Sequence, residues 1–411
     1  MSRFLFVSAP LPGHMDWGGM HRTAARLLAR GHEVVWVTEP YGFPHLQRWG
    51  IPTLAVEQTG WLWPPPPMPK GLSPAEQARE RERRAVAVWL HPDRVLPATE
   101  ALRARVREWQ PDVLVTEPFM AAAGFVAELE RVPLVVAGWP ATRMPDKVPP
   151  QQAEAARLAR DWFERMKGAL GVRGEYWAPG PLPWLRAPLA HIVYFVPEWY
   201  SSWRVLTPPT YYVGGVRPDS REELTGMEDV PEERPWVLVT LGSAFTQDEA
   251  FFHVAVDAVL HAGGYPLVAT GDEALAARLR RAFPSQATVR PWFSFDALFP
   301  YLSLIVHHGG MGTTHAALVH GIPQLVVPHA ADQYYQAARV QRLGLGVALR
   351  TSQVTSAVMR AYVKTLVWES RWREQAQKMA RRMAYFQGVP WAAEILIHLA
   401  STLEGRGEGL A

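Results

Sequence analysis

The sequence predicts an α/β protein built from two doubly wound domains in tandem, each with a parallel sheet between helices. Short apolar runs alternate with longer amphipathic stretches, and this rhythm occurs twice along the chain. The chain has 411 residues, which is more than one hydrophobic core usually organises. A hydrophobic share of 48% is enough to fill two cores.

The first series of strands and helices lies in the N-terminal half. An apolar run at 4–8 predicts a strand, a helix follows at 19–30 and ends at Gly31, and a second strand lies at 33–38. Strands at 113–116 and 133–137 then flank a helix at 119–130. For these strands we expect the order 3-2-1-4-5 that is usual in such sheets.

The second series begins at residue 236. Its predicted strands lie at 236–241, 267–269, 304–306 and 324–327. We therefore expect one domain at 1–216, a polar and Pro-bounded linker at 217–235, and a second domain at 236–385. Helical patterns continue to the C-terminus, and we expect residues 386–411 to pack back on the first domain.

Composition excludes several classes of protein. The 42 basic residues nearly balance the 39 acidic ones, for a net charge of +3, so no nucleic-acid partner is expected. Without cysteine there is neither a disulfide framework nor a thiolate metal site. No apolar run reaches the roughly 18 residues of a spanning helix, and the N-terminus lacks a signal-peptide pattern. We expect a cytoplasmic protein.

The most informative stretch is 306–333, where a strand runs into a glycine-rich turn and then a helix. Glycines at a helix N-terminus let backbone N–H groups approach an anion such as a diphosphate. A plain strand-to-helix turn would also favour these residues. The stretch lacks the Lys of a P-loop and the third glycine of a dinucleotide fingerprint. The adjacent His307 and His308 should point to opposite faces of the strand, which argues against a metal site.

This stretch resembles the donor signature of the UDP-glycosyltransferase superfamily, which comprises inverting enzymes with the GT-B fold. The match includes Gly321-Ile322-Pro323, Pro328 and the closing Asp332-Gln333. The resemblance implies that the diphosphate is held by His308, Gly310, Gly312, Thr313 and the turn at Gly242-Ser243. It also implies that Asp332 and Gln333 bind the sugar hydroxyls and that Trp292 stacks on the base.

Two positions depart from the pattern of many plant members. Ala316 replaces a Glu that contacts the ribose, and Phe295 replaces a Gln near the base. The expected donor is UDP-glucose, with dTDP as the alternative nucleotide.

The segment 8–38 resembles the opening of the same family, which places its general base at the position of His14. A neutral imidazole is suited to take a proton from an acceptor hydroxyl, and a carboxylate partner would fix its tautomer. Glu117 occupies the place of the family's Asp, after the strand at 113–116. Asp16 and Glu39 also lie near strand ends and remain alternative partners. The chain has no Asp-x-Asp pair, so neither a metal nor another cofactor is expected besides the nucleotide sugar.

The acceptor is the least defined part of the prediction. Residues 56–111 and 140–209 match nothing in the family pattern but are rich in Trp, which favours a small apolar or aromatic acceptor. The stretch 61–74 is Pro-rich and reads equally well as an exposed loop or as a lip over the acceptor. The alternatives are a nucleotide-sugar epimerase, a catalytically silent partner protein and a lipid glycosyltransferase at a membrane surface. Membrane contact is possible but not required, and either a monomer or a homodimer is compatible.

Overall fold

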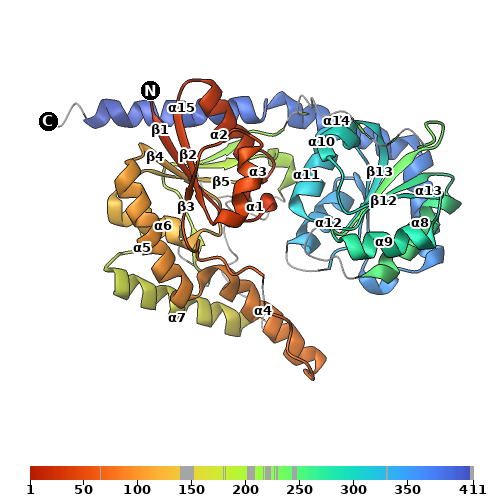
Figure 1. The fold of residues 1–411 in the computed structure, drawn as a ribbon, viewed down its shortest axis with the longest axis horizontal. Coiled ribbons are helices and arrows are strands. Elements are labelled where there is room, and N and C mark those ends of the chain that lie inside the picture. Colours follow the sequence, from red (N-terminus) through yellow and green to blue (C-terminus); the bar gives the residue numbers. More distant parts are fainter. Residues whose placement is uncertain are drawn as a thin grey trace. The chain divides into compact units, whose positions relative to one another are not determined.

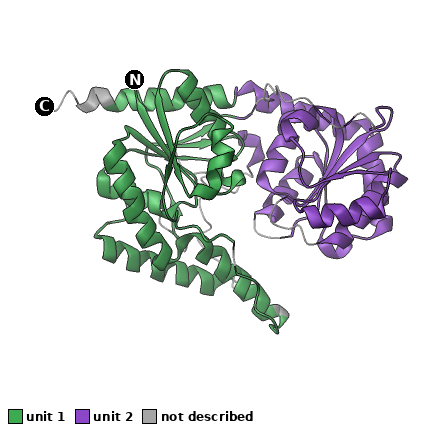
Figure 2. Cartoon of the chain, in the orientation of Figure 1, with its two compact units in different colours: residues 1–194, 201–213, 388–411 green, residues 195–200, 214–387 purple. Residues whose placement is uncertain are grey.

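The chain folds into two compact units, each built around its own sheet (Figures 1 and 2). Unit 1 comprises residues 1–194, 201–213 and 388–411, and unit 2 comprises residues 195–200 and 214–387. The computed structural model describes residues 1–64, 66–138, 152–178, 180, 182–200, 209–215, 217, 224–225, 227, 230–242, 248–329 and 332–407. Parts of the predicted linker at 217–235 and of the Trp-rich stretch at 140–209 lie outside these residues.

Unit 1 contains a parallel sheet of seven strands in the order β3-β2-β1-β4-β5-β8-β9. The expected order of the first five strands is therefore confirmed. Its strands are β1 (Arg3–Val7), β2 (Glu33–Thr38), β3 (Thr53–Ala55), β4 (Val113–Thr116), β5 (Leu134–Ala137), β8 (Ala190–Val193) and β9 (Thr210–Tyr212). A separate antiparallel hairpin pairs β6 (Trp177–Ala178) with β7 (Trp184–Leu185).

Both faces of this sheet are buried, which explains why its strands are almost wholly apolar. Leu5 and Val7 of β1 belong to a core cluster that includes residues of α5 and α6. Phe6 points the other way and stacks on Trp36 of β2, with ring centroids 5.1 Å apart. Thr116, at the end of β4, is buried beside the end of β1, where the paired residues are Val7 and Thr116.

The helices of unit 1 include long ones in the stretch 56–111. In chain order they are α1 (Pro12–Asp16), α2 (Met20–Ala29), the 3-10 turn η1 (Pro40–Gly42), α3 (Phe43–Gln47), α4 (Pro74–Leu90), α5 (Pro92–Trp109), α6 (Ala121–Glu130), α7 (Ala153–Leu170) and α15 (Val389–Gly407). Helix α4 begins at a capping box of Ser73 and Glu76. The alternating charges at 79–84 lie in α4, where Glu80 forms ion pairs with Arg83 and Arg84.

The C-terminal helix α15 returns to unit 1, as expected. It packs on α2, and Arg30 forms an ion pair with Glu394. The backbone N–H of Gly388 donates to Val213 O at 2.7 Å just before the helix begins. These contacts fix the end of the chain to the first sheet domain.

Unit 2 contains a parallel sheet of six strands in the order β12-β11-β10-β13-β14-β15. Its strands are β10 (Trp236–Thr240), β11 (Tyr265–Ala269), β12 (Thr288–Arg290), β13 (Leu302–His307), β14 (Gln324–Val326) and β15 (Gly346–Ala348). Its helices are η3 (Pro197–Trp199), α8 (Glu249–His261), α9 (Glu273–Ala282), α10 (Phe295–Leu298), η4 (Phe299–Tyr301), α11 (Met311–His320), α12 (Gln333–Arg342), η5 (Thr351–Gln353), α13 (Ser356–Trp368) and α14 (Ser370–Tyr385). The four strands predicted here are present, and the sequence missed β12 and β15.

A short segment from the first half of the chain, residues 195–200, belongs to unit 2. The buried guanidinium of Arg339 in α12 donates to the carbonyl oxygens of Glu198 and Trp199. Phe195 meets the edge of His315 in α11, with ring centroids 5.3 Å apart. Because of these contacts, unit 2 includes a segment from the first half of the chain and is not one continuous stretch of sequence.

Across the described ranges, no helix combines the length and the apolar character needed to cross a bilayer.

Candidate active site

His14 lies at the carboxyl end of the first sheet, on the short helix α1. Strand β1 ends at Val7, and Pro12 starts α1, where a proline fits the first helical turn. The helix ends at Trp17, whose backbone has the left-handed φ of 43°. The imidazole of His14 therefore sits directly beyond the central strand, where ligands of doubly wound sheets collect.

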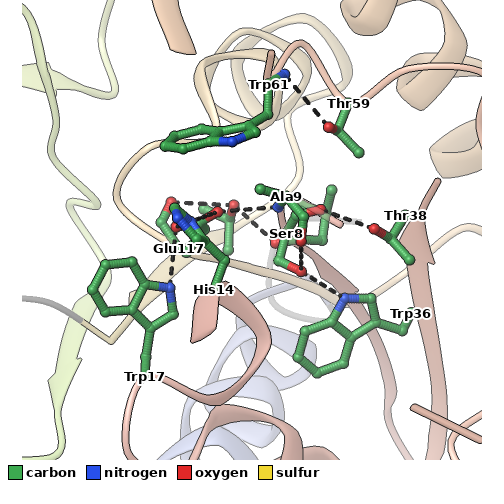
Figure 3. A network of polar contacts seen from close by, with 11 residues as sticks. Ser8, Ala9, His14, Trp17, Trp36, Thr38, Thr59, Trp61 and Glu117 are labelled. Atoms are coloured by element: carbon green, nitrogen blue, oxygen red, sulfur yellow. Dashed lines mark hydrogen bonds and ion pairs between the residues drawn. The ribbon is translucent and has the colours of Figure 1, made fainter. Parts of the chain in front are cut away.

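Glu117 follows β4, the neighbour of β1, and its carboxylate meets His14 (Figure 3). The Nδ1 atom of His14 is 2.8 Å from Glu117 Oε1 and 2.7 Å from Oε2. A carboxylate can only accept, so Nδ1 carries the proton, and Nε2 of the neutral ring is the basic nitrogen. In the described part of the chain, the hydrogen bonds of this imidazole all involve Nδ1.

The Glu117 side chain is completely buried, with 0% of its surface exposed. Two further donors satisfy its oxygens. The backbone N–H of Ala9 donates to Oε1 at 3.0 Å, and the indole Nε1–H of Trp17 donates to Oε2 at 3.1 Å. A buried carboxylate needs such partners, because an unpaired charge in an apolar interior is costly.

The two alternative partners of His14 are engaged elsewhere. Asp16 Oδ1 lies 3.4 Å from Nδ1 of His21. Glu39 Oε1 accepts from both the backbone N–H and the hydroxyl of Thr59, each at 2.8 Å. Among the three carboxylates considered from sequence, the structure thus brings Glu117 to His14.

Aromatic rings surround the exposed side of His14. Its ring centroid lies 4.3 Å from Trp61, 5.2 Å from Trp17 and 6.3 Å from Phe119. Figure 3 shows the Trp61 indole lying across the imidazole and the Glu117 carboxylate. Phe119 also meets the edge of Trp184, with centroids 5.3 Å apart. The imidazole therefore has aromatic rings beside it as well as the Glu117 carboxylate.

In unit 2, His308 follows β13 and begins the glycine-rich turn. A Cβ added to Gly310 would lie 2.4 Å from His308 Nε2, and one added to Gly242 would lie 2.7 Å from Cε1. The turns after β10 and β13 therefore both approach this one imidazole so closely that a side chain at Gly242 or Gly310 would force the ring or the turn to shift. Burial lowers the pKa of His308 to about 3, so the ring is neutral near pH 7.

The neighbouring His307 points into the sheet. Its Nε2 is 3.0 Å from Gln324 Oε1, and its Nδ1 accepts the backbone N–H of Gly309 at 3.2 Å. The planes of the two imidazoles are 89° apart. The two rings thus differ in orientation, and His307 is engaged with Gln324 and the backbone of the glycine turn.

Helix α11 begins at the glycine turn, with Gly310 as its N-cap. Thr313 is buried in the first turn. Gly312 differs from Gly310, since a Cβ placed there would have no neighbour within 4 Å. The space beside Gly312 is thus open. Ser243, which follows Gly242, lies outside the described residues.

Asp332 and Gln333 stand at the start of α12 and differ in exposure. Asp332 is exposed, whereas Gln333 is buried and its Oε1 accepts the backbone N–H of His329 at 2.8 Å. Trp292 lies between β12 and α10 with 61% of its surface exposed. Its indole face is therefore available to a ligand.

Known proteins resemble both halves of the chain. Residues 266–400 match the family described as erythromycin biosynthesis protein CIII-like, C-terminal domain. The aklavinone 7-beta-L-rhodosaminyltransferase of Streptomyces galilaeus is 30% identical over 328 residues, which are 73% of this chain and 69% of that protein. The L-demethylnoviosyl transferase of Streptomyces niveus is 27% identical over 361 residues, 84% of this chain and 85% of that protein. This chain belongs to the bacterial glycosyltransferase superfamily.

Solved structures show that this glycosyltransferase has the GT-B fold. The kitacinnamycin glycosyltransferase superimposes with a TM-score of 0.75 at 21% identity, over 97% of this chain and 99% of that one. The glycosyltransferase VinC, solved in complex with dTDP, gives a TM-score of 0.72 at 18% identity over 97% of this chain and 100% of that one. The predicted fold class is confirmed.

Sequence reasoning missed two groups that hold Glu117 in this glycosyltransferase. The backbone of Ala9 carries no side-chain signal that could have shown its role. Trp17 is followed by Gly18 and Gly19, and a bulky residue before paired glycines was the available signal. Among the described residues, no three His, Asp or Glu side chains are grouped so that they could hold a metal ion.

Proposed function

We propose that this glycosyltransferase moves a sugar from a nucleoside diphosphate sugar to a hydroxyl of a small apolar or aromatic acceptor, with inversion at the anomeric carbon. The observation that carries the proposal is the buried contact between Glu117 and His14 Nδ1, which leaves Nε2 as the basic nitrogen. His14 is the general base in this proposal, and Glu117 orients it and stabilises the imidazolium that forms.

The reaction is a direct displacement. His14 Nε2 takes the proton of the acceptor hydroxyl as its oxygen forms a bond to the anomeric carbon. The bond between that carbon and the diphosphate oxygen breaks on the opposite face, and the nucleoside diphosphate leaves with the electron pair. An α-linked donor then yields a β-glycoside, and the imidazolium returns its proton to solvent.

The first domain, predicted at 1–216, is proposed to bind the acceptor. The half-buried rings of Trp61 and Phe119 lie beside His14 and offer apolar faces. Flat or apolar molecules gain most from such faces, because aromatic stacking adds to the burial of surface. This supports the lip interpretation of the stretch 61–74 over the plain loop.

The second domain, predicted at 236–385, is proposed to bind the donor. The α11 N-terminus, Gly312, Thr313 and the neutral ring of His308 would hold the diphosphate, together with the turn at Gly242-Ser243. These groups would carry the leaving-group charge, so no divalent ion is required. Asp332 and Gln333 would bind the sugar, and Trp292 would stack on the base.

The proposal also concerns which nucleobase and which sugar the donor carries. The sequence favours UDP and glucose, whereas VinC was solved with dTDP. A stacked Trp292 accepts either pyrimidine, because every base offers an apolar face. Direct comparison of the two glucose donors decides between them.

The test is nucleoside diphosphate release from UDP-glucose and dTDP-glucose over a panel of phenols, terpenoids and macrolides, with and without EDTA. We expect release that depends on the acceptor, survives EDTA and yields a β-glycoside. Epimerisation of the donor without acceptor would instead support the epimerase alternative. Donor binding without transfer to any acceptor would support a catalytically silent protein.

A further inference from the structure

Trp17 contacts the same carboxylate as His14, although nothing in the sequence pattern assigns it a role. Its indole Nε1–H donates to Glu117 Oε2 at 3.1 Å, and its ring meets the edge of the His14 imidazole at 5.2 Å (Figure 3). We propose that Trp17 is a positioning residue, which holds the Glu117 carboxylate so that His14 presents Nε2 to the acceptor. This inference rests on the proposed role of His14 as the base.

The geometry of the carboxylate shows what the indole adds. Ala9 N–H holds Oε1 and Trp17 N–H holds Oε2, while His14 Nδ1 lies within 2.8 Å of both oxygens. With one oxygen fixed from each side, the plane of the carboxylate cannot turn relative to the imidazole. Without Trp17, the Ala9 N–H would be the one donor left among the described residues besides His14 itself, and the carboxylate and imidazole could turn together about the last Glu117 torsion, which has broad energy minima.

This extra donor matters because the partner is Glu and not the Asp usual in the family. Glu has one more rotatable bond than Asp, so its carboxylate has more positions to choose from. Complete burial of Glu117 removes water as an alternative partner. The indole therefore compensates for the longer side chain.

The backbone holds Trp17 in place independently of this hydrogen bond. Trp17 ends α1 at a φ of 43°, a left-handed conformation that is strained for a bulky residue, and its N–H donates to Gly13 O at 3.2 Å. At the end of β5, a Cβ on Gly138 would lie 2.6 Å from Trp17 Cγ. The left-handed turn at Trp17 and the absence of a side chain at Gly138 together hold the indole against Glu117.

The test is a double-mutant cycle measured by steady-state transfer. Trp17→Phe keeps an aromatic ring and removes the N–H. We expect kcat to fall about tenfold or more, as for loss of a hydrogen bond to a charged group, with acceptor KM within about twofold. In a Glu117→Ala background the same substitution should change kcat by less than about twofold, because its target is gone.

Trp109→Phe is the matched control, since Trp109 lies under Arg3 at the opposite end of β1, and it should leave both constants unchanged. Should Trp17→Phe fail to fold, β-(3-benzothienyl)alanine at position 17 keeps the ring shape and removes only the donor. Equal effects of the substitution with and without Glu117 would overturn the role of Trp17 while the proposed function stands. A wild-type enzyme that transfers sugar to no acceptor would overturn both.

Discussion

Alanine substitutions at two glycines of the α11 turn separate a diphosphate site from a plain turn. At Gly310 the added methyl would lie 2.4 Å from His308, so we expect overpacking that lowers the free energy of unfolding by about 1–3 kcal/mol. At Gly312 the methyl would meet nothing within 4 Å. Because alanine favours the helix, Gly312→Ala should instead stabilise unit 2 by up to about 1 kcal/mol.

The two hypotheses differ in the effect of Gly312→Ala on nucleotide binding. If the open space beside Gly312 receives the diphosphate, the methyl should weaken UDP or dTDP binding about tenfold, equivalent to about 1.4 kcal/mol. The assay is isothermal titration calorimetry with each nucleotide, beside thermal denaturation of the same samples. A Gly312→Ala protein that is as stable as the wild type or more so and binds both nucleotides with unchanged affinity would refute a diphosphate at this turn.

Two further predictions concern protonation and base stacking. Burial lowers the pKa of His191 to about 4, and its Nε2 accepts the Ala187 N–H, so the unfolded chain binds a proton that the folded chain excludes. The free energy of unfolding should therefore fall as pH drops from about 6.5 towards 4, by about 2 kcal/mol at pH 5 for this imidazole. Urea titrations of His191→Gln should show a shallower pH dependence, whereas the same change at the exposed His398 should leave the slope unaltered. Trp292→Ala should weaken nucleotide binding about tenfold with little loss of stability, because 61% of this side chain is exposed. Trp368→Ala is the control, because it removes an equally exposed indole, which donates to Ala262 O just before β11. If Trp292→Ala and Trp368→Ala bind nucleotide with equal affinity, stacking on Trp292 is contradicted.

Strong periodicity made the two sheets predictable. Buried parallel strands read as continuous apolar runs, and the central strands β1, β4, β10 and β13 were all found from them. The edge strands β3, β12 and β15 have three residues each and are only partly buried, so they lack the continuous apolar run that marks the equally short but fully buried β14. Helices α4 and α7 lie in stretches that match no family pattern, so the resemblance does not indicate them.

The pairing of His14 with Glu117 could be expected because adjacent parallel strands end at the same edge. Choosing Glu117 over Asp16 and Glu39 required side-chain positions, since all three carboxylates follow strands on that side. The sequence marked Trp17 only by the two glycines that follow it, and its hydrogen bond to Glu117 depends on the left-handed turn that ends α1 and on the space left by Gly138. The family motif and the strand order thus predicted the pairing of His14 with Glu117, whereas the contact with Trp17 could be found only from the packing of side chains.

The most direct test of the account is the transfer rate of His14→Ala, measured with saturating donor alongside its affinity for the nucleoside diphosphate. The account predicts that acceptor-dependent transfer falls by at least about a hundredfold, as for loss of a general base, while nucleotide affinity stays within about twofold. Transfer at the wild-type rate by a correctly folded His14→Ala protein would contradict it.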